Sequence, residues 1–508
     1  MRLQLFSPET LVLSLILVSL STAILLNMWR GNGPYSAMAA IALASRVYGN
    51  APQSAASSKP DLSWYKPNAT SINDLTSVIN GTGVFGFQFQ PGTPPSLSPT
   101  TYNWCNMPRV IPSTYSPAPD GYKLEYVEVI QRHHKRTPYA DNTFPHETYP
   151  WYCDDEALAY AGIPIPDSDS VNVVWNVYTS PVNPFAPSGF NGSCQFPQIT
   201  AGGLNDSRQH GKDLFHVYHD KLAFLPSIYD ASKISYRVTN NVITSQVASQ
   251  LILGMYPGTV NTSVSVLIQP DSIDSLEPTY TCTASSDLYS SYGVGSTATN
   301  WTAHLTDSAA LFKKLDAISG VNTTSPAWHQ SFDHYFDNLS ARLCHNKLLP
   351  CKAGSSNSTS ADDCITQADA DAVFRAGEWE YSFIYRDSPA SLAASTLSYG
   401  VWVAELSANL KAVQNRGSSV IYRHNIAHDG SLSRLLSILQ VDVMVWPGMG
   451  SEVNEGQWFV RVLFGGQALR SSNPSLGYLN FVPVSVLTDY IDDLVGVSAT
   501  QVPGLCGS

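Results

Sequence analysis

A β-rich stretch that ends in a cluster of cations decides the fold of this chain. Leu124-Glu125-Tyr126-Val127-Glu128-Val129-Ile130-Gln131 is rich in β-branched and aromatic residues and runs directly into Arg132-His133-His134-Lys135-Arg136-Thr137-Pro138. The first part predicts a strand. A basic cluster at a strand's end is typical of an α/β sheet, which binds ligands beyond the carboxyl ends of its strands.

Two more strand-to-helix units are predicted downstream. Residues 233–237 have strand character, and a helix of about fourteen residues starts near Asn240 with apolar side chains at every fourth position. Strand character returns at residues 419–422, and the helix after Asp429 carries leucines on one face. A further apolar run at 263–268 predicts a buried strand.

The middle of the chain changes to helical periodicity, from about residue 285 to 415. Strands before and after this helical block imply one α/β domain, formed by residues 121–284 and 416–508, with residues 285–415 as a helical insertion. Residues 31–120 are rich in Pro, Ser, Thr and Gly, which predicts a stalk followed by an irregular lead-in.

The 20 residues between Glu9 and Arg30 carry no charge. That length could just span a bilayer and also fits the core of a signal peptide, so residues 1–30 are interpreted as a signal peptide or a membrane anchor, and the choice stays open. Nine Asn-x-Ser/Thr sequons follow, which favours N-glycosylation and passage through the secretory pathway. They begin at Asn68, Asn80, Asn191, Asn205, Asn261, Asn300, Asn322, Asn338 and Asn357.

The eight cysteines form an even set without a Cys-x-x-Cys pair, which favours disulfides over a zinc or redox site. Cys344, Cys351 and Cys364 enclose the sequon at Asn357, as in a surface loop closed by a bridge, but the pairing stays open. We therefore expect a secreted, cell-surface or vacuolar protein, whose oligomeric state the sequence does not indicate.

Composition narrows the classes of partner. Charged residues are only 13% of the chain and the formal net charge is -12, which argues against nucleic acid as a partner. Hydrophobic residues are 44%, enough apolar surface for a folded chain.

Three of the chain's 28 Lys and Arg residues nevertheless fall within positions 132–136. The guanidiniums of Arg132 and Arg136 can each bind two phosphate oxygens, and together they neutralise a dianion. His133, between them, would then be the nucleophile. The alternative is a solvated charge run, but this run follows a strand of apolar character.

Arg132-His133-His134-Lys135-Arg136-Thr137-Pro138 resembles the Arg-His-Gly-x-Arg-x-Pro signature of the histidine phosphatase superfamily, in the branch that holds the histidine acid phosphatases and phytases. His134 stands where the signature commonly has Gly, so we expect its imidazole to line the pocket mouth and to affect pocket width and substrate choice.

The resemblance continues downstream in the family's order. Residues 202–211 resemble its Gly-x-x-Gln-x-x-x-Gly helix start. Tyr236-Arg237-Val238-Thr239 resembles the site of the third phosphate-binding Arg, and Ala427-His428-Asp429 resembles the His-Asp motif. The match covers roughly residues 122–490, and the ordered set is more specific than any single motif.

The resemblance implies both a fold and a reaction. The fold is α/β, a central mixed sheet flanked by helices as in phosphoglycerate mutase, with an inserted α-helical domain. His133 attacks phosphorus to form a phosphohistidine, and Asp429 protonates the leaving alkoxide and later deprotonates water. The phosphate oxygens of a small-molecule monoester are held by Arg132, Arg136, Arg237 and His428. No metal or cofactor is required.

Several alternatives stay open. Asp429 could be only the N-cap of its helix, and Arg237 only an ion-pair partner. Glu452 and Glu455 are then alternative general acids, and His210, His216 and His219 could hold a metal. At the level of function, the alternatives are a phytase-like inositol phosphate hydrolase, which needs a wide cationic pocket for which Lys135 and Lys212 could serve, and a non-catalytic glycosylated surface protein with the same fold.

Overall fold

The protein is described by a computed structural model over residues 2–8, 59–68, 74–84, 89–90, 101–147, 149–153, 160–162, 173–174, 182–184, 192–259, 263–352 and 362–507. The uncharged stretch between Glu9 and Arg30 lies outside these residues, so the signal-peptide or anchor interpretation stays a prediction. Among the helices of the described ranges, none is both long enough and apolar enough to cross a bilayer.

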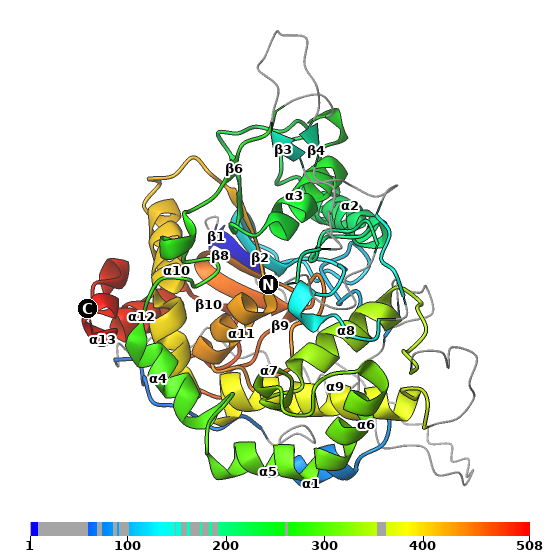
Figure 1. Ribbon diagram of the computed structural model, residues 1–508. Helices are drawn as coiled ribbons and strands as arrows, with labels where there is room; N and C mark the ends of the chain where they lie inside the picture. Colours follow the sequence, from blue (N-terminus) through cyan, green and yellow to red (C-terminus); the bar gives the residue numbers. More distant parts are fainter. Residues whose placement is uncertain are drawn as a thin grey trace, which may run out of the picture.

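A mixed sheet runs through the centre of the molecule (Figure 1), with strand order β10-β8-β1-β2-β7-β5-β6 and with β9 paired to β8. Strands β2, β7, β5 and β6 are parallel to one another, whereas β1, β8 and β10 pair antiparallel with their neighbours. The strands of this sheet are β1 (Arg2–Pro8), β2 (Tyr122–Arg132), β5 (Ile234–Val238), β6 (Val266–Leu267), β7 (Tyr422–Ala427), β8 (Glu452–Phe464), β9 (Gln467–Ala468) and β10 (Asn480–Pro483). A separate pair is formed by β3 (Tyr160–Gly162) and β4 (Val173–Val174).

Strand β2 is buried on both faces, and its alternating side chains enter two different cores. Tyr126 and Ile130 pack with α10 (Ser391–Gln414), α11 (Asp429–Ile438) and α12 (Val484–Val495). Val127 and Val129 pack on the other face with α2 (Ala201–Phe215) and α3 (Val242–Met255). The predicted α/β fold, a mixed sheet flanked by helices, is confirmed.

A helical part lies between β6 and β7 in the sequence and builds a third, largely aromatic core around Phe312, Phe332, Phe336 and Trp446. Its helices are α4 (Thr283–Tyr292), α5 (Thr299–Asp307), α6 (Ala309–Ser319), α7 (Pro326–His329), α8 (Asp333–Cys344) and α9 (Gln367–Ser382), before α10. The boundaries of the helical insertion, residues 285 and 415, remain a prediction. Two short helices complete the fold, α1 (Leu75–Asn80) and α13 (Val502–Leu505).

One expectation for the chain's organisation needs correction. The run 263–268 does not form a buried strand: only Val266 and Leu267 pair, at the edge of the sheet, and Leu267 and Ile268 are each about half exposed. In the predicted irregular lead-in, Trp104 and Cys105 are fully buried in the third core.

All eight cysteines form disulfides, as the even count predicts: Cys105–Cys344, Cys153–Cys194, Cys282–Cys506 and Cys351–Cys364. The last pair encloses position 357, while Cys344 pairs with the distant Cys105. Five sequon asparagines in the described ranges are exposed, at positions 68, 80, 205, 300 and 322.

Asn338 is the exception among the described sequons, because it is fully buried in α8. Its amide nitrogen donates to Asn142 O over 2.8 Å, and its oxygen accepts from Arg342 Nε over 2.9 Å. A glycan attached to that nitrogen would have no room in this packing, so we expect this sequon to be unmodified.

Candidate active site

Two histidines follow neighbouring parallel strands at one edge of the sheet. Arg132 ends β2 and Ala427 ends β7, and these two residues are register partners. The backbone N–H of His133 donates to Ala427 O over 3.0 Å. His133 and His428, the next residue along each strand, therefore lie beside each other, with ring centroids 5.4 Å apart. This is the carboxyl edge, where parallel sheets bind ligands.

The imidazole of His133 is held with one nitrogen available. Its Nδ1 lies 2.9 Å from His134 O, and a carbonyl oxygen can only accept, so Nδ1 carries the proton. Nε2 then keeps its lone pair. Burial, followed by the charges of Arg132, Arg136 and His428, holds the pKa of His133 well below its ordinary value. A neutral imidazole with a free Nε2 can act as a nucleophile.

Asp429 begins α11 and is joined to the end of β2. Its Oδ2 lies 3.1 Å from Nη2 of Arg132 and accepts from Nε1 of Trp446 over 2.8 Å. Burial alone would raise the pKa of Asp429. The charge of Arg132 and the indole hydrogen bond outweigh this effect, and the pKa of Asp429 lies below its ordinary value. The N-cap position belongs to His428, so the alternative that Asp429 is only a helix cap is wrong.

The two arginines beside His133 are fixed by different partners. Arg132 donates from Nη1 to Pro447 O over 2.8 Å, and its guanidinium lies 4.8 Å from the ring centre of Trp104. Arg136 donates from Nη1 to Asp337 Oδ1 over 2.8 Å and lies 4.3 Å from the ring centre of Tyr139. Both side chains are almost fully buried, so neither belongs to a solvated charge run.

His428 has two neighbours that sequence reasoning missed. Its Nε2 lies 3.0 Å from Thr239 Oγ1 and 3.3 Å from Glu277 Oε2. Thr239 follows the end of β5, and this position beyond a parallel strand could have signalled a site residue. Glu277 lies in the irregular segment before α4, where no pattern points to it.

The structure does not bring Arg237 to this group. Its Nη1 donates to Glu405 Oε2 over 2.7 Å, and its Nη2 lies 3.1 Å from Asp274 Oδ1 and 2.9 Å from Ser275 Oγ. Arg237 points to the α10 side of β5, because alternate strand residues face opposite sides and Tyr236 and Val238 face the α3 core. Its contact with phosphate stays a prediction.

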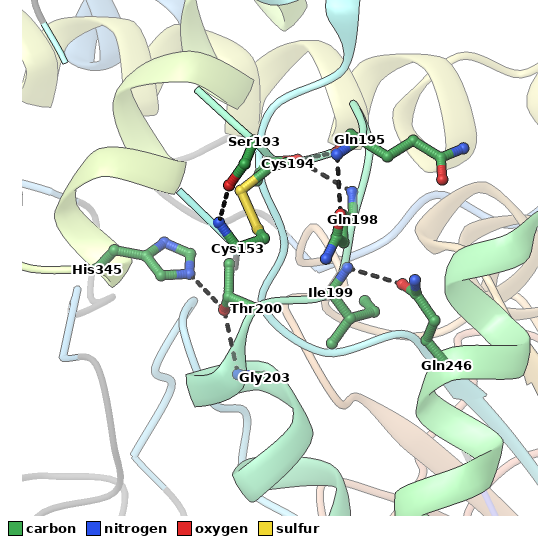
Figure 2. The surroundings of a disulfide bond; sticks show 11 residues. Cys153, Ser193, Cys194, Gln195, Gln198, Ile199, Thr200, Gly203, Gln246 and His345 are labelled. Carbon is green, nitrogen blue, oxygen red and sulfur yellow. Dashed lines mark hydrogen bonds between the residues drawn. A yellow bond between two sulfur atoms is a disulfide. The ribbon is translucent and has the colours of Figure 1, made fainter. Parts of the chain in front are cut away.

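The loop before α2 holds the segment after His133 in place. Thr137 N donates to Gln198 O and Thr200 N to Lys135 O, so residues 135–137 run against this loop. Figure 2 shows how the loop is tied: the Cys153–Cys194 disulfide anchors its start, and Thr200 caps α2 by accepting from Gly203 N. A Cβ on Gly203 would lie 2.1 Å from Lys135 O, so only glycine allows α2 to approach this closely.

His134 does not line the pocket mouth, contrary to expectation. Its side chain is fully buried, with Nε2 3.2 Å from Nδ1 of His210. His210 Nε2 in turn lies 2.5 Å from Glu452 Oε2. A Cβ on Gly450 would lie 2.6 Å from the His134 ring. The imidazole therefore fills space behind the nucleophile and ties the β2 end to α2 and β8.

The remaining alternatives can be placed as well. Glu452 is fully buried against His210 and Val110 N, so it does not face a substrate. The side chain of Glu455 lies outside the described part of the structure. His216 and His219 both bond Asp220 at the surface, and within the described residues no group of three His, Cys, Asp or Glu side chains could hold a metal.

Comparisons with known proteins give distant relatives. No protein-family model matches the chain. It is 26% identical to counting factor 60 of Dictyostelium discoideum over 382 residues, which cover 72% of this chain and 84% of that protein. It is 25% identical to a probable acid phosphatase of the same organism over 168 residues, 31% of this chain and 30% of the relative.

Among solved structures, the chain is similar to the Hafnia alvei phytase in complex with tartrate, at 13% identity and a TM-score of 0.48 over 75% of this chain and 99% of that one. The phytase from D. castellii is 14% identical, with a TM-score of 0.44 over 84% of this chain and 93% of that one.

Two findings point in the same direction. One relative is a probable acid phosphatase, and the structure groups the motif residues at one edge of the sheet, namely Arg132, His133, Arg136, His428 and Asp429. Both findings are consistent with the predicted resemblance to the histidine acid phosphatase and phytase branch of the histidine phosphatase superfamily.

Proposed function

We propose that this protein is a histidine-type acid phosphatase that hydrolyses phosphate monoesters through a phosphohistidine at His133. The observation that carries the proposal is the state of His133: a buried, neutral imidazole whose Nδ1 is engaged by His134 O. Its free Nε2 lies beside Arg132, Arg136 and His428, which suit a phosphate dianion.

In the first step, Nε2 of His133 forms a bond to phosphorus while the bond from phosphorus to the alcohol oxygen breaks. The leaving oxygen takes that electron pair and the proton of Asp429. In the second step, water attacks the phosphohistidine, the N–P bond breaks, and Asp429 accepts the water's proton. The products are the alcohol and inorganic phosphate, and His133 is regenerated.

Arg132, Arg136 and His428 would hold the phosphate oxygens and stabilise the charge that spreads over them in the transition state. Without substrate, Arg132 keeps Asp429 ionised. A bound phosphate competes for the Arg132 guanidinium and adds negative charge beside Asp429, and both effects raise the pKa of that carboxyl. Substrate binding would thus help to supply the proton that the leaving group needs.

The four disulfides support a location in the secretory pathway, because such bridges persist in oxidising compartments. We propose a secreted, cell-surface or vacuolar enzyme that carries N-glycans on its exposed sequons.

The test is hydrolysis of p-nitrophenyl phosphate at about pH 5, where a carboxyl can still serve as an acid. His133→Ala should lower kcat by at least about 10,000-fold, as loss of a covalent nucleophile does. Asp429→Asn should lower it by roughly 100- to 10,000-fold. Equal and negligible rates for the wild type and His133→Ala would refute the proposed function. EDTA should leave the rate unchanged.

A further inference from the structure

A row of aromatic rings runs from the proposed proton donor toward the surface. Trp446 donates to Asp429, and Tyr381 of α9 stacks on its ring, with centroids 3.9 Å apart and planes inclined by 11°. Tyr385 follows at 5.0 Å from Tyr381, and Tyr289 of α4 at 5.9 Å from Tyr385. Trp446 is buried, whereas the three tyrosines are partly exposed.

A cation packs against the outer part of the row. The guanidinium of Arg434 lies 5.4 Å from the ring centre of Tyr385 and 5.6 Å from that of Tyr289. It is itself fixed, because Nη1 donates to Gly430 O and Nε donates to Ser398 Oγ, each over 2.9 Å. A surface fixed before binding loses little entropy when it receives a ligand.

The outer rings present unused polar groups next to Asp429. Within the described chain, the hydroxyls of Tyr381 and Tyr385 make no hydrogen bond, and neither oxygen is buried. The Tyr385 hydroxyl lies 3.9 Å from where a Cβ on Gly430, the residue after Asp429, would stand. Partly exposed rings with free hydroxyls are typical of a surface that binds a flat organic group.

Two acidic side chains near this surface disfavour a polyanion. Lys135, which could have widened a cationic pocket, is buried and paired with Asp206 at 2.8 Å. Glu277 beside His428 is about one-third exposed, and Asp333 on α8 is about half exposed. Burial raises the pKa of Tyr381, and the negative charges of Asp429 and Asp333 raise it further. The carboxylate of Asp333 is therefore close enough to act on the ring row. A substrate with several phosphates would meet these negative charges.

We propose, resting on the phosphatase function above, that the substrate is a monophosphate ester of an aromatic alcohol, whose ring binds along Tyr381 and Tyr385. In an in-line displacement, His133 and the leaving oxygen lie on opposite sides of phosphorus. Asp429 must reach the leaving oxygen, so the alcohol starts at Asp429. From there the row Trp446–Tyr381–Tyr385 leads outward.

The experiment uses phosphonates, which bind like phosphates but are not hydrolysed, so the leaving group's own reactivity does not enter. Inhibition constants of benzylphosphonate, ethylphosphonate and inositol hexasulfate are measured against p-nitrophenyl phosphate hydrolysis. We expect benzylphosphonate to bind roughly 3- to 10-fold more tightly than ethylphosphonate, which is the gain expected of one aromatic stack. Inositol hexasulfate should be the weakest of the three.

Two variants test whether the rings cause this preference. Tyr381→Leu and Tyr385→Leu each keep an apolar side chain of moderate size, and each should bring the ratio of the two inhibition constants close to one without changing that of ethylphosphonate. Tyr478→Ala, at a tyrosine that is 45% exposed and lies on Arg470, is the matched control and should leave the ratio unchanged.

The outcomes separate the two proposals. If the wild type hydrolyses p-nitrophenyl phosphate but binds both phosphonates equally, or binds inositol hexasulfate best, the aromatic substrate is excluded and the phosphatase function stands. A preference that survives in both leucine variants also excludes the ring row. A wild type that neither hydrolyses the ester nor binds any of the three probes overturns both proposals.

Discussion

The indole N–H of Trp446 offers a clean way to test whether Asp429 is the general acid. Trp446→Phe removes one hydrogen bond to Asp429 Oδ2, of 2.8 Å, and keeps an aromatic ring against Tyr381 and Phe336. A hydrogen bond to an ionised group contributes about 1.5–3 kcal/mol, and one pKa unit corresponds to about 1.4 kcal/mol. The pKa of Asp429 should therefore rise by about one to two units.

The sign of the effect follows from the acid's role. In the proposed mechanism Asp429 donates only when protonated, so activity should fall as pH rises through its pKa. A higher pKa moves this descending limb to higher pH. The measurement is the pH dependence of kcat/KM for p-nitrophenyl phosphate, in which the limb should shift by about one to two pH units.

The matched control is Trp301→Phe. Trp301 is fully buried and donates its indole N–H to Gln330 O over 3.0 Å, so this variant also loses one buried indole hydrogen bond. It should lose comparable stability without a shift of the limb. An unshifted limb in Trp446→Phe, with activity reduced equally in both variants, would show that Asp429 does not supply the proton.

Three further predictions concern other residues. Burial raises the pKa of Glu378 from 4.5 to about 8, so between these pH values the folded state keeps a proton that the unfolded state loses, and stability falls as pH rises. Glu378→Gln should flatten this decline of the unfolding free energy, measured by denaturant titration at several pH values. An unchanged decline in the variant would contradict the prediction. Arg237→Ala should lower Tm, because it leaves Asp274 buried without its cation, yet change KM for p-nitrophenyl phosphate by less than about threefold; a tenfold rise would instead support the phosphate contact. Glycopeptide mass spectrometry should find Asn338 unmodified while exposed sequons such as Asn205 carry glycans, and an occupied Asn338 would contradict the packing of α8.

The sequence predicted those parts of the fold that depend on local pattern. The strand 124–131 and the helices after Asn240 and Asp429 appear as β2, α3 and α11, because their apolar spacing and helix starts are encoded in consecutive residues. The run 263–268 misled for the same reason: an apolar run cannot reveal that its strand lies at the edge of the sheet.

The site was predictable where motif residues directly follow strands. His133 and His428 lie together because β2 and β7 are parallel neighbours. Contacts between distant segments were not predictable: Trp446 reaches Asp429 across 17 positions, Asp337 reaches Arg136 across 201, and no local pattern encodes either contact. The expected position of the His134 side chain was wrong. The family signature usually has Gly at this position, so it carries no information about the contact with His210.

The Cys105–Cys344 bridge sets an order of assembly for the protein during its synthesis. It joins positions 239 residues apart and tethers the segment under Arg132 to α8, whose Asp337 holds Arg136. Closing a loop of that length in the unfolded chain costs about 5 kcal/mol, which the bridge removes once formed. Arg136 is therefore oriented by a contact that can form only after about two-thirds of the chain has been made. A nascent chain released before Cys344 would contain the complete Arg132–Arg136 motif but could not form the disulfide that ties α8 to the segment under Arg132.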